Sequence, residues 1–360
     1  MRLSTSFNLL SLSFLPSCLA LPSSNTPANP FTFYNLPTPL SGPCDLCTGP
    51  DNAIWAQDIL VDKLVRLDPL TGSVTEYDIP FTIPPLPASV IPSIAGRTAF
   101  SCAIRPGADG NIYAANGIRN QLVQLNLKTK QIKVFTPPPP NPAGNLQPFN
   151  DLWSGPTGMF STQTTGNVIN FFDYKTETFK TYTIPTVEGS PLSLIVASDG
   201  ATWFTEFIGN KIGRLNASSG AVDEFPVPEL LSGPAVIRVE TERRFLWFTA
   251  ITGNALGRID MQTKEVAVFP NPNPASFPAE DTGPDCRGRV YFSTATQNVL
   301  NYYDPATEEF DTVRIPGSLL GVTMPVGLPP VVDIAINLGP GDAVWFTEAT
   351  ENRIGRYALS

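Results

Sequence analysis

An internal repeat constrains this chain more than any other feature. The stretches 202–216 (TWFTEFIGNKIGRLN), 246–260 (LWFTAITGNALGRID) and 344–357 (VWFTEATENRIGRY) are close copies of one another. With Trp203 as the anchor, weaker copies become visible at intervals of about 43 to 58 residues. The anchor positions are Trp55, Tyr113, Phe160, Trp203, Trp247, Tyr291 and Trp345. The chain therefore contains seven copies of one structural unit.

A polar turn residue stands seven positions after every anchor. These residues are Asp62, Asn120, Asn167, Asn210, Asn254, Asn298 and Asn352. Asn and Asp tolerate left-handed backbone dihedrals and hydrogen-bond their own turn. We therefore interpret this column as structural.

A strand with an aromatic or apolar residue three positions before a proline ends each of the first six units, as in 74–80 (VTEYDIP). A unit of about 44 residues with four short strands is typical of a propeller blade. The seventh unit lacks this last strand, but 31–37 (FTFYNLP) has the same spacing. We expect an all-β fold, a seven-bladed β-propeller of four-stranded blades. The N-terminal strand closes the ring in the last blade and protects sheet edges that would otherwise be exposed.

Residues 1–20 have one basic residue, an apolar stretch and small residues before Ala20, which predicts a secretory signal peptide. Residues 21–360 then form a single propeller domain. The formal net charge of −9 and the absence of basic clusters argue against a nucleic-acid partner, and no later stretch is apolar enough to span a membrane. We expect a secreted monomer, or one in the lumen of the secretory pathway.

Four cysteines remain after removal of the signal peptide: Cys44, Cys47, Cys102 and Cys286. In an oxidising compartment this number favours two disulfides, for which three pairings exist. Cys44 and Cys102 each precede an anchor by the same distance, at matching points of neighbouring inner strands, so they form a reasonable pair. The sequence Asn216-Ala-Ser218 predicts a glycosylation site in a turn.

The inserts of the repeat all fall on connections that reach one face of the ring. They are 81–96, 139–148, 186–190, 229–233, 273–282 and 317–329. Loops of variable length on a repeated scaffold are where binding and catalysis tend to lie. We therefore expect a ligand site at the mouth of the central channel on this face, although the prolines could also merely stiffen the connections.

Histidine is absent from all 360 residues, so a mechanism with a histidine base or a zinc site is not expected. The polar candidates stand three residues after the anchors. They are Asp58, Asn116, Gln163, Glu206, Thr294 and Glu348, with Ala250 in the fifth unit. One interpretation is a set of strand-end residues that satisfy loop amides. The other is a polar collar that orients a ligand.

If the collar is functional, Glu206 and Glu348 would face each other across the channel. They could act as acid and base, or hold Ca²⁺ or Mg²⁺ together with Asp58 through oxygen ligands. Lys211 and Arg353 could donate cationic hydrogen bonds, and Phe207 would contribute to an apolar mouth.

The pattern Trp-Phe-Thr-Glu, then Gly-Asn-Lys-Ile-Gly-Arg, then an aromatic strand ending in proline, resembles the streptogramin (virginiamycin B) lyase family of seven-bladed propellers. The resemblance covers roughly Phe31 to Ser360. It implies a lyase that depends on histidines around a magnesium ion, and no position here supplies those histidines. The signal peptide, the paired cysteines and the lack of histidine are also similar to secreted fungal tailoring propellers of the hetero-Diels–Alderase type.

We therefore expect a secreted tailoring enzyme of secondary metabolism that acts on a small apolar terpenoid or polyketide. Cyclisation or cycloaddition without a metal ion requires two reacting groups held in place, and no histidine. The alternatives are a metal-assisted C–O lyase or lactonase, and a propeller that binds without catalysis.

Overall fold

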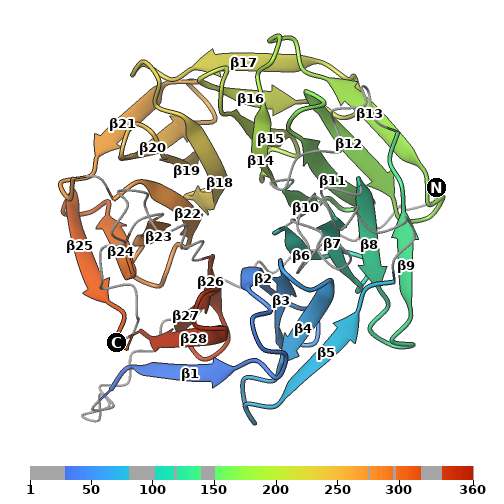
Figure 1. The fold of residues 1–360 in the computed structure, drawn as a ribbon. Helices are drawn as coiled ribbons and strands as arrows, with labels where there is room; N and C mark the ends of the chain where they lie inside the picture. Colours follow the sequence, from blue (N-terminus) through green and yellow to red (C-terminus); the bar gives the residue numbers. More distant parts are fainter. Residues whose placement is uncertain are drawn as a thin grey trace, which may run out of the picture.

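The computed structural model describes residues 29–80, 102–116, 120–138, 151–274, 276–294, 297–317 and 335–359. These residues form 28 strands in seven four-stranded antiparallel sheets, arranged as a ring (Figure 1). The described part of the chain contains no helix, and therefore none that could cross a membrane. The expected all-β seven-bladed propeller is confirmed.

The blades follow one another along the chain. Blade 1 contains β2 (Pro43–Thr48), β3 (Ile54–Asp58), β4 (Lys63–Leu67) and β5 (Val74–Asp78). Blade 2 contains β6 (Ile104–Pro106), β7 (Ile112–Asn116), β8 (Gln121–Leu125) and β9 (Ile132–Phe135). Blade 3 contains β10 (Leu152–Ser154), β11 (Gly158–Gln163), β12 (Val168–Asp173) and β13 (Phe179–Thr183). Blade 4 contains β14 (Pro191–Val196), β15 (Thr202–Glu206), β16 (Lys211–Leu215) and β17 (Val222–Pro226).

The remaining three blades complete the ring. Blade 5 contains β18 (Pro234–Thr241), β19 (Phe245–Ala250), β20 (Ala255–Asp260) and β21 (Val266–Pro270). Blade 6 contains β22 (Pro278–Thr282), β23 (Val290–Thr294), β24 (Val299–Asp304) and β25 (Glu309–Arg314). Blade 7 contains β26 (Ile336–Gly339), β27 (Ala343–Glu348), β28 (Arg353–Ala358) and the N-terminal strand β1 (Phe31–Asn35).

Strand β1 closes the ring as the sequence predicts. It pairs antiparallel with β28, and Tyr34 lies opposite Ile354. Tyr34 also stacks on the anchor Trp345 at 5.8 Å between ring centroids. The N-terminal strand therefore takes the place that the fourth strand takes in the other blades.

The second strand of each blade is buried on both faces, because neighbouring blades pack against both sides of it. All five residues of β15 are buried, whereas the outer strand β17 contains only half-buried and exposed residues. Trp203 lies in a cluster that joins blades 4 and 5 and stacks on Phe225 at 5.8 Å. The ring of Phe204 lies over Gly213, where a Cβ atom would collide with it.

The turn column has the structural role that the sequence predicts. Five of its seven members adopt a positive φ, between 48° and 56°. In blade 4, the Asn210 side chain donates to the Glu229 carbonyl at 2.8 Å and accepts from the Gly233 amide at 3.3 Å. This side chain therefore fixes the connection to the next blade.

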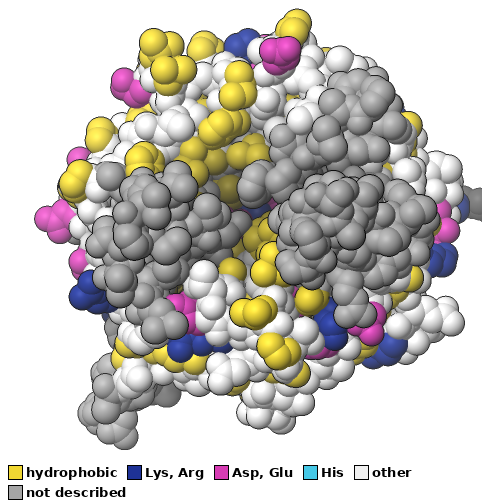
Figure 2. Space-filling view, viewed as in Figure 1, with side chains coloured by type: hydrophobic (Ala, Val, Ile, Leu, Met, Phe, Trp, Pro, Cys, Tyr) yellow, Lys and Arg dark blue, Asp and Glu magenta, His cyan; other side chains and the backbone are white. Residues whose placement is uncertain are grey.

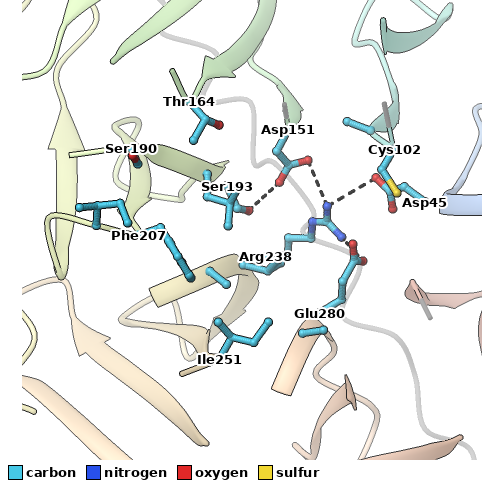
Figure 3. A pocket seen from close by; sticks show the side chains of 16 residues that line it. Asp45, Cys102, Asp151, Thr164, Ser190, Ser193, Phe207, Arg238, Ile251 and Glu280 are labelled. Carbon is cyan, nitrogen blue, oxygen red and sulfur yellow. Dashed lines mark hydrogen bonds and ion pairs between the residues drawn. The ribbon is translucent and has the colours of Figure 1, made fainter. Parts of the chain in front are cut away.

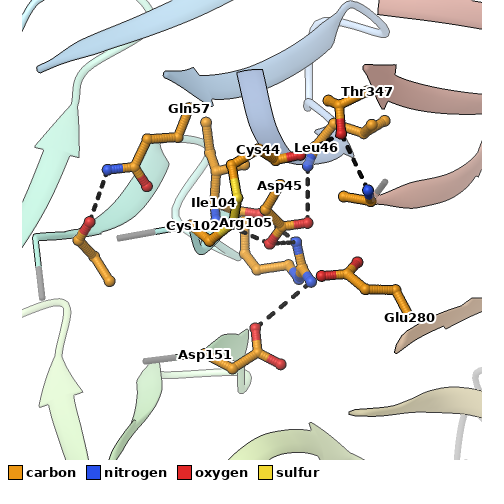
Figure 4. Close-up of a disulfide and its surroundings, with 12 residues drawn as sticks. Cys44, Asp45, Leu46, Gln57, Cys102, Ile104, Arg105, Asp151, Glu280 and Thr347 are labelled. Carbon is orange, nitrogen blue, oxygen red and sulfur yellow. Dashed lines mark hydrogen bonds and ion pairs between the residues drawn. A yellow bond between two sulfur atoms is a disulfide. The ribbon is translucent and has the colours of Figure 1, made fainter. Parts of the chain in front are cut away.

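One of the two expected disulfides is present. Cys44 and Cys102 are bonded, with 5.2 Å between their Cα atoms, and join blade 1 to the residues that lead into blade 2 (Figure 4). The prediction of a second disulfide is wrong, because Cys47 and Cys286, both among the described residues, are not bonded to each other. Cys47 is buried in the core between blades 1 and 2, whereas Cys286 is exposed in the β22–β23 turn of blade 6.

Several sequence-based expectations fall outside the described residues. They are the signal peptide at 1–20, the inserts at 81–96 and 139–148, and all but Gly317 of the insert at 317–329.

Candidate functional site: a cavity over a charged channel floor

A cavity of about 480 Å³ lies where the inner strands of several blades meet (Figure 3). Its apolar wall consists of Ala103, Leu192, Phe207, Ile208, Ala235, Val236, Ile251 and Ala279. Two of these, Phe207 and Ile208, belong to the β15–β16 turn, so the cavity opens on the face where the blade-to-blade connections run. Hydrophobic side chains extend from the rim near β17 towards the centre of this view (Figure 2).

The floor of the cavity is an arginine among carboxylates. Arg238 lies on β18, whose register with β19 is irregular between Ile237 and Val239. Its guanidinium forms an ion pair with Glu280, and its Nη2 lies 3.1 Å from Asp151 and 3.4 Å from Asp45. The three carboxylates come from blades 6, 3 and 1, so this one side chain ties together strands from four blades.

A second arginine completes the network (Figure 4). Arg105 Nη1 lies 2.7 Å from Asp45, and its Nη2 lies 3.6 Å from Asp151. The hydroxyl of Ser193 donates to Asp151 at 2.6 Å. Two guanidinium groups therefore face three carboxylates in a region that is almost closed to solvent.

The charges of this network stabilise one another. Burial alone would raise the pKa of Asp151, but Arg238 and Arg105 hold it below its ordinary value. Burial likewise opposes the charge of Arg238, yet Asp151, Asp45 and Glu280 raise the pKa of this guanidinium. The next residue after Glu280 behaves differently, since burial raises the pKa of Asp281 to about 8. Asp281 therefore binds a proton more readily than a free aspartate does.

None of the polar residues of the predicted collar lines this cavity, whereas Phe207, predicted for the apolar mouth, does. The six polar members of the column are all buried at the ends of the second strands. Gln163 donates to Asn120, Asn116 donates to Gln121 at 3.3 Å, and Thr294 donates to the Gln297 carbonyl at 2.9 Å. In these three cases the column satisfies neighbouring turns.

Lys211 belongs to a cluster within blade 4. Its ammonium group donates to Glu224 at 2.7 Å and to the Thr186 hydroxyl at 2.6 Å. Burial, followed by the nearby Glu224 carboxylate, raises the pKa of Glu206 to about 7. Blade 1 repeats this arrangement, because Lys63 pairs with Glu76 at 2.8 Å and burial raises the pKa of Asp58 to about 7.

Glu348 and Arg353 form a pair within blade 7. The guanidinium Nε of Arg353 donates to Glu348 at 2.5 Å, and the guanidinium lies 3.8 Å from the ring centroid of Phe33. Burial raises the pKa of Glu348 although Arg353 opposes this. Glu206 on β15 and Glu348 on β27 lie on opposite sides of the ring, and no contact brings them together (Figure 1).

The residues at the channel do not fit the magnesium site that the lyase resemblance implies. Among the described residues, no three Asp, Glu, Cys or His side chains are grouped to hold a metal ion. The three carboxylates that do converge, Asp45, Asp151 and Glu280, are already neutralised by guanidinium groups. A divalent cation at this place would have to displace Arg238.

Sequence reasoning missed this network. Its charged members stand about 8 to 11 residues before the anchors, on strands that a propeller directs towards its channel. The positions vary by a few residues because the inner strands contain register shifts. A search for charged residues on the inner strands, in place of a search at one fixed spacing, would have found them.

Comparisons with known proteins agree with the fold. The profile of the Virginiamycin B lyase family matches residues 152–360. Virginiamycin B lyase from Staphylococcus aureus, in selenomethionine form, superimposes with a TM-score of 0.76 and 23% identity, over 92% of this chain and 99% of that chain. A streptogramin B lyase structure gives a TM-score of 0.72 and 21% identity, over 91% of this chain and 96% of that chain.

A third similar structure contains a ligand. It is a catalytically inactive histidine-to-alanine variant of the Staphylococcus aureus virginiamycin B lyase with quinupristin, at a TM-score of 0.72 and 22% identity, over 92% of this chain and 99% of that chain. A search of curated protein sequences gave no significant match. At these identities the solved structures establish the fold alone. The family profile, however, spans more than half of the sequence, and the chain belongs to the virginiamycin B lyase family.

Proposed function

We propose that this protein is a secreted tailoring enzyme that holds a small, largely apolar natural product in the channel cavity and promotes its cyclisation or cycloaddition without a metal ion. The observation that carries this proposal is the cavity itself. It combines an apolar wall with a charged floor formed by Arg238 and Glu280.

The wall would supply most of the rate enhancement. A pericyclic or cyclisation step needs reacting groups in near-attack geometry, and positioning of this kind is worth roughly 7 to 11 kcal/mol. Phe207, Ile208 and Ile251 offer apolar surface on one side of the cavity. A terpenoid or polyketide of suitable shape would be held there without fixed polar contacts.

The charged floor of the cavity would supply the electrostatic part of the rate enhancement. Arg238 is held in place by three carboxylates, so it need not reorganise when charge develops on a substrate oxygen. Asp45, Asp151 and Glu280 all line the cavity, and Glu280 directly follows the wall residue Ala279 in the chain. Glu280 is our candidate for proton transfer to or from the substrate.

Family membership favours a second candidate, a C–O lyase. In its metal-assisted form, as a lyase or lactonase, it would use the carboxylates Glu206, Glu348 and Asp58 with Ca²⁺ or Mg²⁺. Lys211 and Arg353 would then act as hydrogen-bond donors. Because these residues contact partners within their own blades, this alternative requires them to act outside the cavity.

Secretion is part of the proposal. The disulfide Cys44–Cys102 is compatible with an oxidising compartment. Asn216, the predicted glycosylation site, is exposed in the β16–β17 turn. Enzymatic deglycosylation of the secreted protein should lower its mass, and an Asn216→Gln variant should show no such change.

The test begins with the metabolites of a strain that lacks this gene. Extract from that strain is incubated with purified protein, with and without EDTA, and the products are compared by mass spectrometry. We expect a cyclised product to form in both conditions. Product formation should fall about a hundredfold for Glu280→Gln, whereas Glu308→Gln, an exposed carboxylate of blade 6, serves as the matched control.

The same assay separates the alternatives. Loss of turnover with EDTA would indicate that the reaction takes place at the collar. Loss of turnover in Glu206→Gln and Lys211→Met, with Glu280→Gln still active, would indicate the same. An extract that remains unchanged in every condition would leave a binding propeller as the better description.

A further inference from the structure

Within the part of the chain that the structure describes, one arginine of the repeat has no oxygen partner, and this sets blade 5 apart. Arg66, Arg214, Arg258 and Arg356 occupy the same position on the third strands of blades 1, 4, 5 and 7, directly opposite the anchor tryptophans. In blades 4, 5 and 7 the guanidinium lies between 5.3 and 5.8 Å from the tryptophan ring centroid. The shared position makes the four sites directly comparable.

In blades 1 and 4 an aspartate binds both members of this pair. Asp51 accepts from the Trp55 indole at 2.9 Å and from Arg66 Nε at 2.7 Å. Asp199 accepts in the same way from Trp203 at 3.2 Å and Arg214 at 3.1 Å. In blade 7 a backbone carbonyl replaces the carboxylate, since Arg356 donates to the Gly341 oxygen at 2.8 Å.

Blade 5 has lost this acceptor. The Trp247 indole donates to the Thr241 hydroxyl at 2.9 Å, and a threonine cannot neutralise a guanidinium. On the outer strand, Ala267 lies opposite Arg258, where blade 4 has Asp223 at 3.8 Å from Arg214. Among the described residues Arg258 has no hydrogen bond or ion pair, and its contacts are with aromatic rings.

The guanidinium faces a pocket of about 340 Å³ on the side of the ring opposite the channel cavity. The pocket lies between blades 5 and 6, and its lining includes Phe245, Trp247, Pro284 and Pro305. The ring centroid of Phe245 lies 4.4 Å from the Arg258 guanidinium carbon.

The other charged residues of the pocket are Arg287 and Glu242, both exposed. Glu242 lies in the β18–β19 turn next to Arg243 and Arg244. The pKa of Arg244 is raised mainly by its hydrogen bond to Asp260, and Glu242 contributes to this rise. Arg258 is therefore the half-buried charge of the pocket, and an acidic ligand can replace the aspartate that blades 1 and 4 carry.

We propose that this pocket binds the carboxylate of a small molecule with a flat apolar body. An arginine presents its N–H groups to a carboxylate in a bidentate fork, and such charge-assisted hydrogen bonds are stronger than neutral ones. The aromatic and proline side chains would cover the apolar body of the ligand. The site is independent of the channel cavity and of the proposed reaction there.

The experiment uses benzoate as the probe and neutral benzamide, which has the same shape, as its control. Binding to the purified full-length protein is measured by isothermal titration and by saturation-transfer NMR. We expect benzoate to bind and to exceed benzamide in affinity by at least about tenfold, the effect of one charge-assisted contact.

Two variants and a matched control locate the site. Arg258→Gln removes the cation, and Thr241→Asp restores the internal acceptor of blades 1 and 4, so each should weaken benzoate binding at least about tenfold. Arg66→Gln, at the same position of blade 1, should leave binding unchanged. The proposal is overturned if wild-type protein does not prefer benzoate over benzamide. It is also overturned if Thr241→Asp, which keeps every other group of the pocket, binds benzoate as well as wild type.

Discussion

The outer three strands of the blades and the innermost strands follow different rules. In the outer strands the roles recur: the anchor tryptophans of blades 1, 4, 5 and 7 pack on the aromatic residue of the fourth strand. The turn residues Asn167, Asn210, Asn254 and Asn352 donate to carbonyls of the connection that follows. The innermost strands carry register shifts and unlike residues, among them Asp45, Arg105 and Arg238. Regularity therefore marks packing, and departure from the repeat marks the places where a ligand can be held.

Removal of an anchor should give the largest effect, because it tests the regular region. Trp203→Ala should lower the free energy of unfolding by about 4 kcal/mol, since it leaves a cavity between blades 4 and 5. Trp203→Tyr should cost much less, because blades 2 and 6 already carry a tyrosine whose hydroxyl donates to an aspartate. Urea denaturation measures both. Equal losses would mean that the anchor is not held by packing.

Removal of Arg238 tests the irregular region. Arg238→Met leaves three buried carboxylates with one guanidinium fewer, so the free energy of unfolding at pH 7 should fall by about 3 kcal/mol. The deficit should shrink as the pH falls below about 5, because the orphaned carboxylates take up protons in the folded state. Arg243→Met, an exposed neighbour, should show neither effect. A deficit that does not depend on pH would contradict this account of the network.

Most of the fold was predictable, because the same pattern of buried, turn and strand residues occurs in seven repeats of the sequence. The fourth strand of blade 1, expected within 74–80, is β5 at Val74–Asp78, and the closing strand pairs where the spacing of Tyr34 and Pro37 places it. The turn asparagines adopt the left-handed dihedrals that their chemistry suggests. These features depend on local residues and on a fixed period.

The candidate site was predicted less well, for two physical reasons. The prediction that Glu206 lies at the end of a strand was correct. However, the sequence does not reveal that neighbouring blades cover the second strand on both faces. Because of this packing, the collar residues lie away from the cavity. Arg238 was missed because the irregular register of β18 cannot be read from a period. Its partners are also far away in sequence, with Asp45 and Glu280 in other blades.

The collar carboxylate Glu206 provides a smaller test through pH. Its pKa is raised from 4.5 to about 7 in the folded protein, so the folded state binds a proton that the unfolded state has lost between these values. The free energy of unfolding should therefore fall as the pH rises through this window, by about 2 kcal/mol from this group. Glu206→Gln should remove that part of the slope, and Glu188→Gln, which is exposed, should not. Thermal melts between pH 4 and pH 8 measure the slope, and identical profiles for wild type and Glu206→Gln would contradict the burial of an ionisable carboxyl.

The smallest effect should come from the turn column, where two contributions can be separated. Asn210 has a φ of 53° and donates to the carbonyls of Val227 and Glu229. Asn210→Gly keeps the left-handed backbone and loses only the side-chain hydrogen bonds, at a cost of about 1 kcal/mol. Asn210→Ala loses these bonds and adds backbone strain, for a total of about 2 kcal/mol. If the two variants unfold at the same urea concentration, the turn asparagine stabilises the fold through its hydrogen bonds alone. If glycine matches wild type, only the backbone geometry matters, and the link between neighbouring blades must be carried by other contacts.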